Sequence, residues 1–284
     1  MDKFGQICED IKSLKIQGAT SIAKAAIEAL QIRHDNASVK KLISLRATEP
    51  CLRNAIRFCL VDMEKNPGIA LRHFDEAQKT ISEEVANKIE GGSIIFTHCH
   101  SNNVVKALIA ASKKKKFTVY NTETRPRFQG RKTAEELAKA GIPVEHFVDS
   151  AARVALKKCD LALIGADAIT SEGKVINKIG SEMFAEIADR FDIPFYVCSD
   201  SWKYDSMTMF GFEEEIETRY ESEVWDKPPR GVKINNISFE KIDPELITGI
   251  ISDIGVFGPQ AFVTEVTRHF PWIQQGRGEK GGSP

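Results

Sequence analysis

The segment FTHCHSNN, which spans residues 96–103, places the thiol of Cys99 between the imidazoles of His98 and His100. It lies where an apolar strand pattern, SIIF, changes into a helical pattern, VVKALIAASKKKK. Such residues suit metal binding, nucleophilic catalysis, acid–base catalysis or plain core packing. Because side chains alternate between the faces of a strand, the two histidines point away from Cys99 unless the backbone turns sharply. This alternation disfavours a shared metal ion.

A carboxyl group, Asp167, lies in a similar place in the segment LALIGADAITSEGKVINKIGS. The strand before it is apolar throughout, so the carboxyl group is partly desolvated and its pKa rises unless cations compensate. Cys99 precedes a helix N-terminus, which lowers the pKa of a thiol and favours a thiolate near neutral pH. A thiol and a carboxyl group on opposite sides of a crevice can share proton transfers. The two residues therefore predict acid–base chemistry.

Several segments have residues that suit phosphate binding. Asn177 and Lys178 precede a helix expected to begin near Gly180, so an amide, an ammonium group and a helix N-terminus meet there. The segment KIQGATSIAKAA places Gly18 and Ala19 before another helix, where free backbone N–H groups allow close approach of an anion. Two further signals are weaker. One is Arg46, a cation near a helix start, and the other is a polar loop after a strand, which contains Arg125, Arg127, Gln129 and Arg131.

The elements that position these residues alternate in type along the chain. Residues 1–92 follow helical patterns, whereas short apolar runs alternate with helical patterns over residues 93–273. This alternation predicts an α/β fold, in which a small helical N-terminal domain precedes a mostly parallel sheet covered by helices. The Gly-rich residues 274–284 predict a disordered tail.

A polar residue follows each of the expected strands. In an open parallel sheet the ligand crevice lies outside the carboxyl ends of the strands. We therefore expect five of these residues to gather along one edge of the sheet: Cys99, Glu123, Asp149, Asp167 and Asp200.

Composition and charge exclude several classes of function. With 284 residues and a net charge of −1, no global field attracts nucleic acid or an acidic membrane. Six cysteines are scattered without a CxxC pair, which argues against a disulfide framework and a structural zinc site. The N-terminus is too charged for a signal peptide, and no apolar run approaches the roughly 18 residues of a membrane span. The sequence predicts a cytoplasmic protein with free thiols.

Separated motifs resemble those of the archaeal-type ribose-1,5-bisphosphate isomerases, in the same order along the chain. They are THCHS, TETRPRFQGRKTAEELAKAGIPV, VDSAARVAL, GADAITSEGKVINKIGS and SDSWKYD. These enzymes are related to methylthioribose-1-phosphate isomerase and to the alpha, beta and delta regulatory subunits of initiation factor two B. The resemblance covers about residues 10–270 and implies a helical N-terminal domain and a Rossmann-like domain.

The resemblance also implies roles for individual residues. The catalytic pair of the family falls on Cys99 and Asp167, because Cys99 follows TH and Asp167 ends GAD. The residues implied to bind substrate are Gln17, Gly18, Ala19, Arg46, Ser101, Gln129, Asn177, Lys178 and Lys203. The chain departs from the family at Gln17, where the usual phosphate loop has arginine, and also in RATEP and DSWKY, where the family has RPTEP and ETYKF.

The implied activity is the conversion of α-D-ribose 1,5-bisphosphate to D-ribulose 1,5-bisphosphate in the salvage of AMP and nucleosides. Asp167 would transfer a proton at the ring oxygen or hydroxyls, and Cys99 would remove the proton at carbon 2; a hydride shift remains an alternative. No metal or other cofactor is needed, and the N-terminal domain would act as a lid. The family implies a homo-oligomer, as a dimer or a hexamer.

Two alternatives remain open. A methylthioribose-1-phosphate isomerase would have an apolar pocket in place of the second phosphate site. A noncatalytic regulatory protein would bind initiation factor two, but such subunits generally lack the Cys–Asp pair that this chain has.

Overall fold

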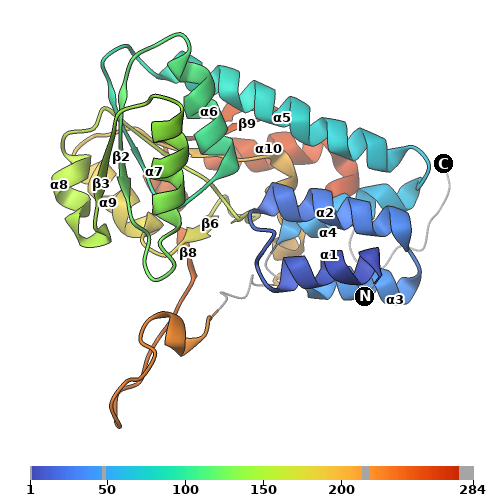
Figure 1. Cartoon of the computed structure of the whole chain (residues 1–284). Helices are drawn as coiled ribbons and strands as arrows, with labels where there is room; N and C mark the ends of the chain where they lie inside the picture. Colours follow the sequence, from blue (N-terminus) through green and yellow to red (C-terminus); the bar gives the residue numbers. More distant parts are fainter. Residues whose placement is uncertain (1, 47–48, 213–217, 275–284) are drawn as a thin grey trace.

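The computed structural model describes residues 2–46, 49–212 and 218–274. It has the expected α/β architecture, in which a mostly parallel sheet lies between helices and a bundle of helices stands at one side (Figure 1). None of the described helices is both long enough and apolar enough to cross a membrane.

The N-terminal part is helical, as the sequence predicts. Two of its helices begin at aspartate caps: the Asp2 carboxylate accepts from Gly5 N–H at 2.8 Å and the Asp35 carboxylate accepts from Ala37 N–H at 3.0 Å. The helices before the first strand are α1 (Lys3–Lys12), α2 (Ala19–Ile32), α3 (Asn36–Ser44), α4 (Pro50–Val61) and α5 (Asn66–Lys88).

Seven strands of the described chain form one sheet in the order β10-β9-β7-β4-β1-β2-β3. All neighbours pair in parallel except β10 and β9. From the central pair the chain continues outward in one direction through β2 and β3, and in the other through β7 and β9. The point between β1 and β4 is therefore a topological switch point, where open α/β sheets bind ligands. The strands are β1 (Ile94–Thr97), β2 (Thr118–Thr122), β3 (Val144–Phe147), β4 (Leu161–Ile164), β7 (Phe195–Cys198), β9 (Gly249–Ser252) and β10 (Gly255–Phe257).

Both faces of the sheet are covered, which explains why its strands are apolar at successive positions. In β4, Leu161 and Leu163 pack into the core on one face, and Ala162 and Ile164 pack into the core on the other. The helices that follow the first strand are α6 (Asn102–Ser112), α7 (Gln129–Lys139), α8 (Ala152–Leu156), α9 (Ser181–Arg190) and α10 (Pro259–His269). Short 3₁₀ turns lie between these elements: η1 (Asp149–Ala151), η2 (Ser201–Lys203), η3 (Ser206–Phe210), η4 (Glu221–Glu223), η5 (Pro244–Leu246) and η6 (Pro271–Gln274).

Helix α5 belongs to both parts of the molecule. Phe74, in its first half, joins the core of the N-terminal helices, whereas Ile81 and Val85 pack with α6 against the sheet. The long helix therefore ties the bundle to the sheet (Figure 1). The domain division at residue 92 stays a prediction, and of the predicted tail only Gln274 is described, at the end of η6, while residues 275–284 lie outside the described ranges.

The sequence did not predict a second, antiparallel sheet. It consists of β5 (Ala168–Ile169), β6 (Val175–Lys178) and β8 (Phe239–Ile242), in the order β5-β6-β8. Gly173 makes the expected turn at φ +80°, and α9 begins at Ser181, close to the expected start. Asn177 and Lys178 are the last two residues of β6, a strand that the sequence did not predict.

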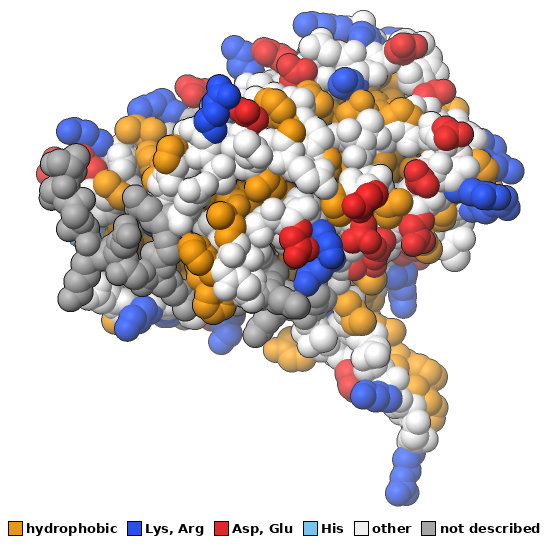
Figure 2. Space-filling view, turned by 180° about the vertical axis from the view of Figure 1, so that it is seen from behind, with side chains coloured by type: hydrophobic (Ala, Val, Ile, Leu, Met, Phe, Trp, Pro, Cys, Tyr) orange, Lys and Arg blue, Asp and Glu red, His pale blue; other side chains and the backbone are white. Residues whose placement is uncertain are grey.

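Residues 218–238 form an arm that projects away from the body of the molecule (Figures 1 and 2). A bridge between Thr218 and Ile237 joins the two sides of the arm at its base. Several apolar side chains on the arm are exposed, among them Tyr220 and Trp225.

Candidate active site

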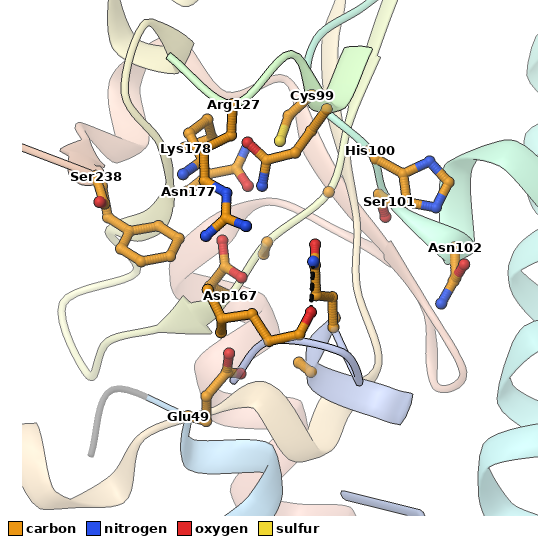
Figure 3. Close-up of a pocket in the computed structure, with 18 of the residues that line it drawn as sticks. Glu49, Cys99, His100, Ser101, Asn102, Arg127, Asp167, Asn177, Lys178 and Ser238 are labelled. Atoms are coloured by element: carbon orange, nitrogen blue, oxygen red, sulfur yellow. Dashed lines mark hydrogen bonds between the residues drawn. The ribbon is translucent and has the colours of Figure 1, made fainter. Parts of the chain in front are cut away.

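A pocket opens at the switch point between β1 and β4, and the residues predicted from the sequence gather in it (Figure 3). Cys99 follows β1 and Asp167 follows β4, so neighbouring central strands carry the two groups. The predicted residues that line the pocket are Gln17, Gly18, Ala19, Arg46, Cys99, Ser101, Gln129, Asp167, Asn177, Lys178 and Lys203. The structure places them together; their roles are proposals.

The backbone fixes the position of Cys99. The residue adopts φ +63°, so the chain turns sharply directly after β1. Its N–H donates to Thr124 Oγ1 at 3.0 Å, and its carbonyl accepts from Thr133 Oγ1 at 2.7 Å. Hydrogen bonds on both sides of an unusual φ hold the thiol at the pocket wall without requiring a contact from the sulfur itself.

The expectation of a thiolate near neutral pH is wrong for the free protein. Burial raises the pKa of the Cys99 thiol to about 11, although the Lys178 ammonium partly offsets that effect. Helix α6 begins only at Asn102, three residues after Cys99, and its N-cap is Ser101. Desolvation therefore outweighs the helix N-terminus, and the thiol is protonated at neutral pH.

The two histidines beside Cys99 are held by separate partners. His98 Nε2 lies 3.0 Å from the Ile179 carbonyl and so must donate to it, whereas Nδ1 lies 2.6 Å from Thr122 Oγ1 and accepts. Burial lowers the pKa of His98 to about 4, more than the charge of Asp149 raises it, so the ring is neutral. His98 is therefore a structural residue next to Cys99 and does not itself line the pocket.

His100 has one buried ring nitrogen without a proton, 4.0 Å from the Glu136 carboxylate. The Thr133 hydroxyl donates its proton to the Cys99 carbonyl, so it accepts from His100 Nδ1–H at 3.1 Å. Nε2 of His100 is then an acceptor, and it has no hydrogen-bond partner among the described residues. Burial lowers the pKa of His100, which keeps the ring neutral.

Asp167 lies across the pocket from Cys99, at the end of a tightly packed connection. A side chain at Gly165 would place Cβ 2.6 Å from Ser101 Oγ, so only glycine allows the segments after β1 and β4 to approach this closely. The Asp167 backbone N–H donates to Ile176 O at 2.8 Å. Its negative charge contributes to the raised pKa of Cys99, which shows that the two groups interact electrostatically.

Two lysines bring positive charge to this side of the pocket. Lys203, only 4% exposed, places Nζ 2.8 Å from the Ala166 carbonyl, directly beside Asp167. Lys178 places Nζ 4.7 Å from the centre of the Phe239 ring. Asn177 Nδ2 donates to Ser181 Oγ, at the first residue of α9. These groups form a cationic wall that suits an anion.

The opposite wall comes from the N-terminal helices. Gly18 is the N-cap of α2 with φ +86° and no capping side chain, so the first N–H groups of α2 are open to an anion. Gln17 Nε2 donates to the Leu14 carbonyl at 2.6 Å. Arg46 lies 3.2 Å from Glu49, and this nearly buried carboxylate offsets part of its charge.

Several residues of the pocket were not predicted. Glu223, on the arm, accepts from Arg127 at 3.3 Å and from Arg219 at 3.0 Å. Burial raises the pKa of Glu223, but the two guanidinium groups outweigh that effect and lower it. Arg127 had a signal in the sequence, as one of several arginines in a polar loop, and His100 stood out beside Cys99. The polar residues of the lining without such a signal are Thr20, Glu49, Asn102, Asn103, Lys132, Arg219, Glu223 and Ser238.

Three of the five residues expected along the sheet edge do not line the pocket. Asp149 instead accepts from Thr124 N–H at 2.9 Å and Arg125 N–H at 2.7 Å. Glu123 pairs with Arg131 at 3.2 Å, and Asp200 caps the turn η2. Asp149 and Asp200 stabilise the loops that follow the strands by accepting from backbone N–H groups, whereas Glu123 pairs with a side chain.

Fold and pocket together define a Rossmann-like protein with a helical N-terminal region and a thiol–carboxyl pair at its switch point. Residues 15–259 match the Initiation factor 2 subunit family, and the chain belongs to this family. A relative named ribose 1,5-bisphosphate isomerase, from Methanocaldococcus jannaschii, is 34% identical over 97% of this chain and 98% of its own length.

Solved structures share the fold. The translation initiation factor eIF-2B of Pyrococcus horikoshii OT3 is similar with a TM-score of 0.81 and 25% identity, over 93% of this chain and 99% of that one. The 5-methylthioribose 1-phosphate isomerase of Pyrococcus horikoshii OT3 has a TM-score of 0.75 at 22% identity, over 94% of this chain and 88% of that one.

Proposed function

We propose that the protein is an isomerase that converts α-D-ribose 1,5-bisphosphate to D-ribulose 1,5-bisphosphate. One observation carries the proposal: Cys99 and Asp167 face a single pocket whose two walls both suit a phosphate group. The 34% identity to a ribose 1,5-bisphosphate isomerase over nearly the full chain supports the same substrate.

The proposed reaction redistributes protons while the carbon skeleton stays intact. Opening the ring breaks the bond between carbon 1 and the ring oxygen, and Asp167 gives that oxygen a proton. Cys99 takes the proton from carbon 2, and the electron pair of that bond forms a carbon 1–carbon 2 double bond in a phosphoenolate. Carbon 1 then regains a proton while the hydroxyl on carbon 2 loses one and becomes a ketone. Each transfer is general acid–base catalysis.

Cys99 must lose its own proton before it can act as the base, and the Asp167 carboxylate must gain one before it can act as the acid. Transfer of the thiol proton to Asp167 across the pocket meets both needs. Burial of the thiol opposes this loss, and the Lys178 ammonium favours it, since a nearby cation stabilises a thiolate. We assign Lys178 this second role beside phosphate binding. The raised pKa therefore predicts that only a small fraction of the free enzyme is in the reactive form.

The walls of the pocket supply one anion site each. Lys178, Lys203 and Asn177 form the first, and the open N-terminus of α2 with Arg46 forms the second. Between them, Gln129 Oε1 and Asn103 Nδ2 are buried and have no hydrogen-bond partner within the described part of the chain. Buried polar atoms are normally paired, so these atoms suit the hydroxyl groups of a bound sugar.

Phosphorus and proton NMR of purified protein with ribose 1,5-bisphosphate tests the proposal. Appearance of the ribulose 1,5-bisphosphate resonances is the expected result. Turnover of methylthioribose 1-phosphate alone would favour the first alternative. Absence of turnover on either sugar, together with stable binding to initiation factor two, would favour a regulatory protein.

We further propose that the enzyme works in the salvage of AMP and nucleosides, in the cytoplasm, as a homo-oligomer. The described cysteines are all free, which fits a reducing compartment. Exposed apolar side chains on the arm at residues 218–238 fit an interface with a second copy. Light scattering during size-exclusion chromatography tests the assembly: a dimer or hexamer that Trp225→Ser dissociates is expected, and a monomeric wild type would contradict it.

A further inference from the structure

The short turn that carries Lys203 is held by two carboxylates, the buried Asp200 and the partly buried Asp253. Asp200 Oδ1 accepts from Trp202 N–H at 2.9 Å. Asp253 accepts from Ser201 twice, from N–H and from Oγ, both at 2.7 Å. The turn η2 therefore owes its shape to these two side chains, and Lys203 is its last residue.

His73, on α5, stands against this pair of carboxylates. Its Nε2 donates to Asp200 Oδ1 at 3.3 Å, and its ring stacks on Trp202 with centroids 4.2 Å apart. A ring nitrogen of His73 and one carboxylate oxygen each of Asp200 and Asp253 all lie within 4.8 Å of one another. Two carboxylates this close repel each other, so a cation beside them stabilises the arrangement.

The charge state of His73 fits this position. Burial lowers the pKa of His73, but the carboxylates of Asp200 and Asp253, with a smaller effect of Glu76, outweigh burial and raise it. The rings of Trp202, Phe74 and Phe270 enclose the imidazole. The carboxylates therefore favour the protonated form of the ring, and the aromatic contacts fix its orientation.

The same three residues do not form a vacant metal site. Both oxygens of Asp253 accept from Ser201, and Asp200 Oδ1 already accepts from Trp202 and His73. Their shared feature is the turn they hold, not an open coordination sphere.

Helix α4 holds the turn from another direction. Asn54 Nδ2, which is buried, donates to Trp202 O at 2.8 Å and to Tyr204 O at 2.9 Å. The N-terminal helices thus contact both the Asp200 carboxylate and the backbone on either side of Lys203. Because Lys203 Nζ reaches the Ala166 carbonyl beside Asp167, a shift of this turn would move a cation of the pocket.

We propose that His73 is a positioning residue for the isomerase reaction: through Asp200 it fixes the turn η2 and so holds Lys203 in the pocket beside Asp167. His73 itself does not touch the pocket, so it acts only through Lys203. The kinetic side of this inference rests on the proposed function, whereas the geometric side does not.

His73→Phe is the first test, because phenylalanine keeps the stacking on Trp202 and removes both donor and charge. We expect kcat/KM to fall by roughly 10- to 100-fold, since misplacement of a catalytic-site group by about 1 Å costs on the order of 100-fold. His269→Phe is the matched control, because His269 is exposed near the end of α10 and lies beside the same Phe270. It should retain wild-type kinetics.

The double variant separates positioning from general damage. In the Lys203→Ala background, adding His73→Phe should change kcat/KM by less than about twofold, because the positioned group is already gone. If the effects of the two single substitutions multiply, His73 acts elsewhere and the proposal fails.

Labelling of Lys203 gives a readout that does not need activity. Acetic anhydride modifies Lys203 slowly in the wild type because the ammonium is buried and bonded, and mass spectrometry should show severalfold faster modification in His73→Phe. If Lys203 is modified at the same rate in a folded His73→Phe protein as in the wild type, the proposal is overturned. If that variant does not fold, His73→Leu, which also lacks a donor and a charge, replaces it and is judged by the same criterion.

The labelling result also separates the two claims of function and position. A wild type without isomerase activity refutes the proposed function, yet faster labelling in His73→Phe still supports positioning. Active wild type with unchanged labelling and kinetics in His73→Phe refutes positioning alone.

Discussion

At the scale of single residues, the pocket combines groups whose protonation is controlled by burial. Cys99 keeps its proton, whereas His98 and His100 stay neutral, because desolvation disfavours the charged form of each. The Lys178 ammonium then lowers the pKa of the Cys99 thiol, and the Asp167 carboxylate raises it. Each of these effects gives a pH dependence that can be measured.

Alkylation should report the raised pKa of Cys99. With a pKa of about 11, the thiolate fraction, and hence the rate of reaction with iodoacetamide, rises about tenfold for each pH unit between pH 7 and 9. Mass spectrometry of the Cys99 peptide measures the rate, and Cys99→Ser confirms the assignment. A rate that is high at pH 7 and flat up to pH 9 would mean that the thiol is already ionised.

His98 should make the protein less stable in mild acid. Its folded-state pKa of about 4 lies below the ordinary 6.5, so the unfolded chain binds a proton more readily between these values. The contribution to the free energy of unfolding is complete above pH 6.5 and is lost as pH falls toward 4, by roughly 3 kcal/mol.

Urea unfolding at several pH values between 4 and 7 measures this loss. His98→Asn removes the titrating group, so the decrease in this window should be smaller by that amount, whereas the exposed His34→Asn should behave as the wild type. Identical pH dependence in wild type and His98→Asn would contradict the assignment.

At the scale of elements, substrate specificity depends on two anion sites that face each other across the pocket. The site at the N-terminus of α2 has the uncharged Gln17, and its Arg46 is paired with Glu49. The site around β6 has Lys178, with Lys203 near it. The first site should therefore bind phosphate more weakly than the second.

Kinetics of variants at both sites should show two phosphate contacts. Arg46→Ala and Lys178→Ala should raise KM and lower kcat for the bisphosphate, because phosphate binding energy also favours the closed arrangement of the pocket. Gln17→Arg should lower KM roughly tenfold, as expected for an added charge-assisted hydrogen bond.

Gln6→Arg on α1 controls for the added charge of Gln17→Arg, since it introduces the same group away from the pocket. Ribose 1-phosphate serves as the comparison substrate. If Arg46→Ala and Lys178→Ala each change KM and kcat equally for the bisphosphate and the monophosphate, the protein uses a single phosphate. That result would favour the methylthioribose-1-phosphate alternative.

The sequence predicted the central elements well because their signals are local. Apolar runs ending at Thr97 and Ile164 mark buried strands, and the polar residues after them fall at the same sheet edge, as the structure confirms. The turn at Gly173 is similarly local.

Other features depend on contacts between distant segments and had no such signal. Pairing of β6 with β8 joins residues 175–178 to residues 239–242, and Glu223 reaches Arg127 only because the arm returns to the pocket. The prediction that the pKa of Cys99 is lowered was wrong for the same reason: a sequence shows the start of a helix but not how deeply the thiol is buried.

At the scale of the whole molecule, the helical bundle and the sheet build the pocket together. Gly18 and Arg46 come from the bundle, whereas Cys99, Asp167 and Lys178 come from the strand ends. Helices α4 and α5 are fastened to the turn η2 by Asn54 and His73. A movement of the bundle toward the sheet on substrate binding would therefore also shift Asn54 and His73, and with them the turn that carries Lys203.

The central claim is that Cys99 and Asp167 move protons on a sugar bisphosphate, and isotope exchange tests it most directly. Ribose 1,5-bisphosphate is incubated with the enzyme in deuterium oxide, and NMR follows carbon 1 of the product. A phosphoenolate that regains its proton from solvent-exchanged groups predicts ribulose 1,5-bisphosphate with one deuterium at carbon 1. Cys99→Ser and Asp167→Asn should fold but lower kcat by roughly 10²–10⁴, the usual contribution of a positioned acid or base. Product without deuterium would indicate a hydride shift, and full activity of either variant would contradict the role assigned to that residue.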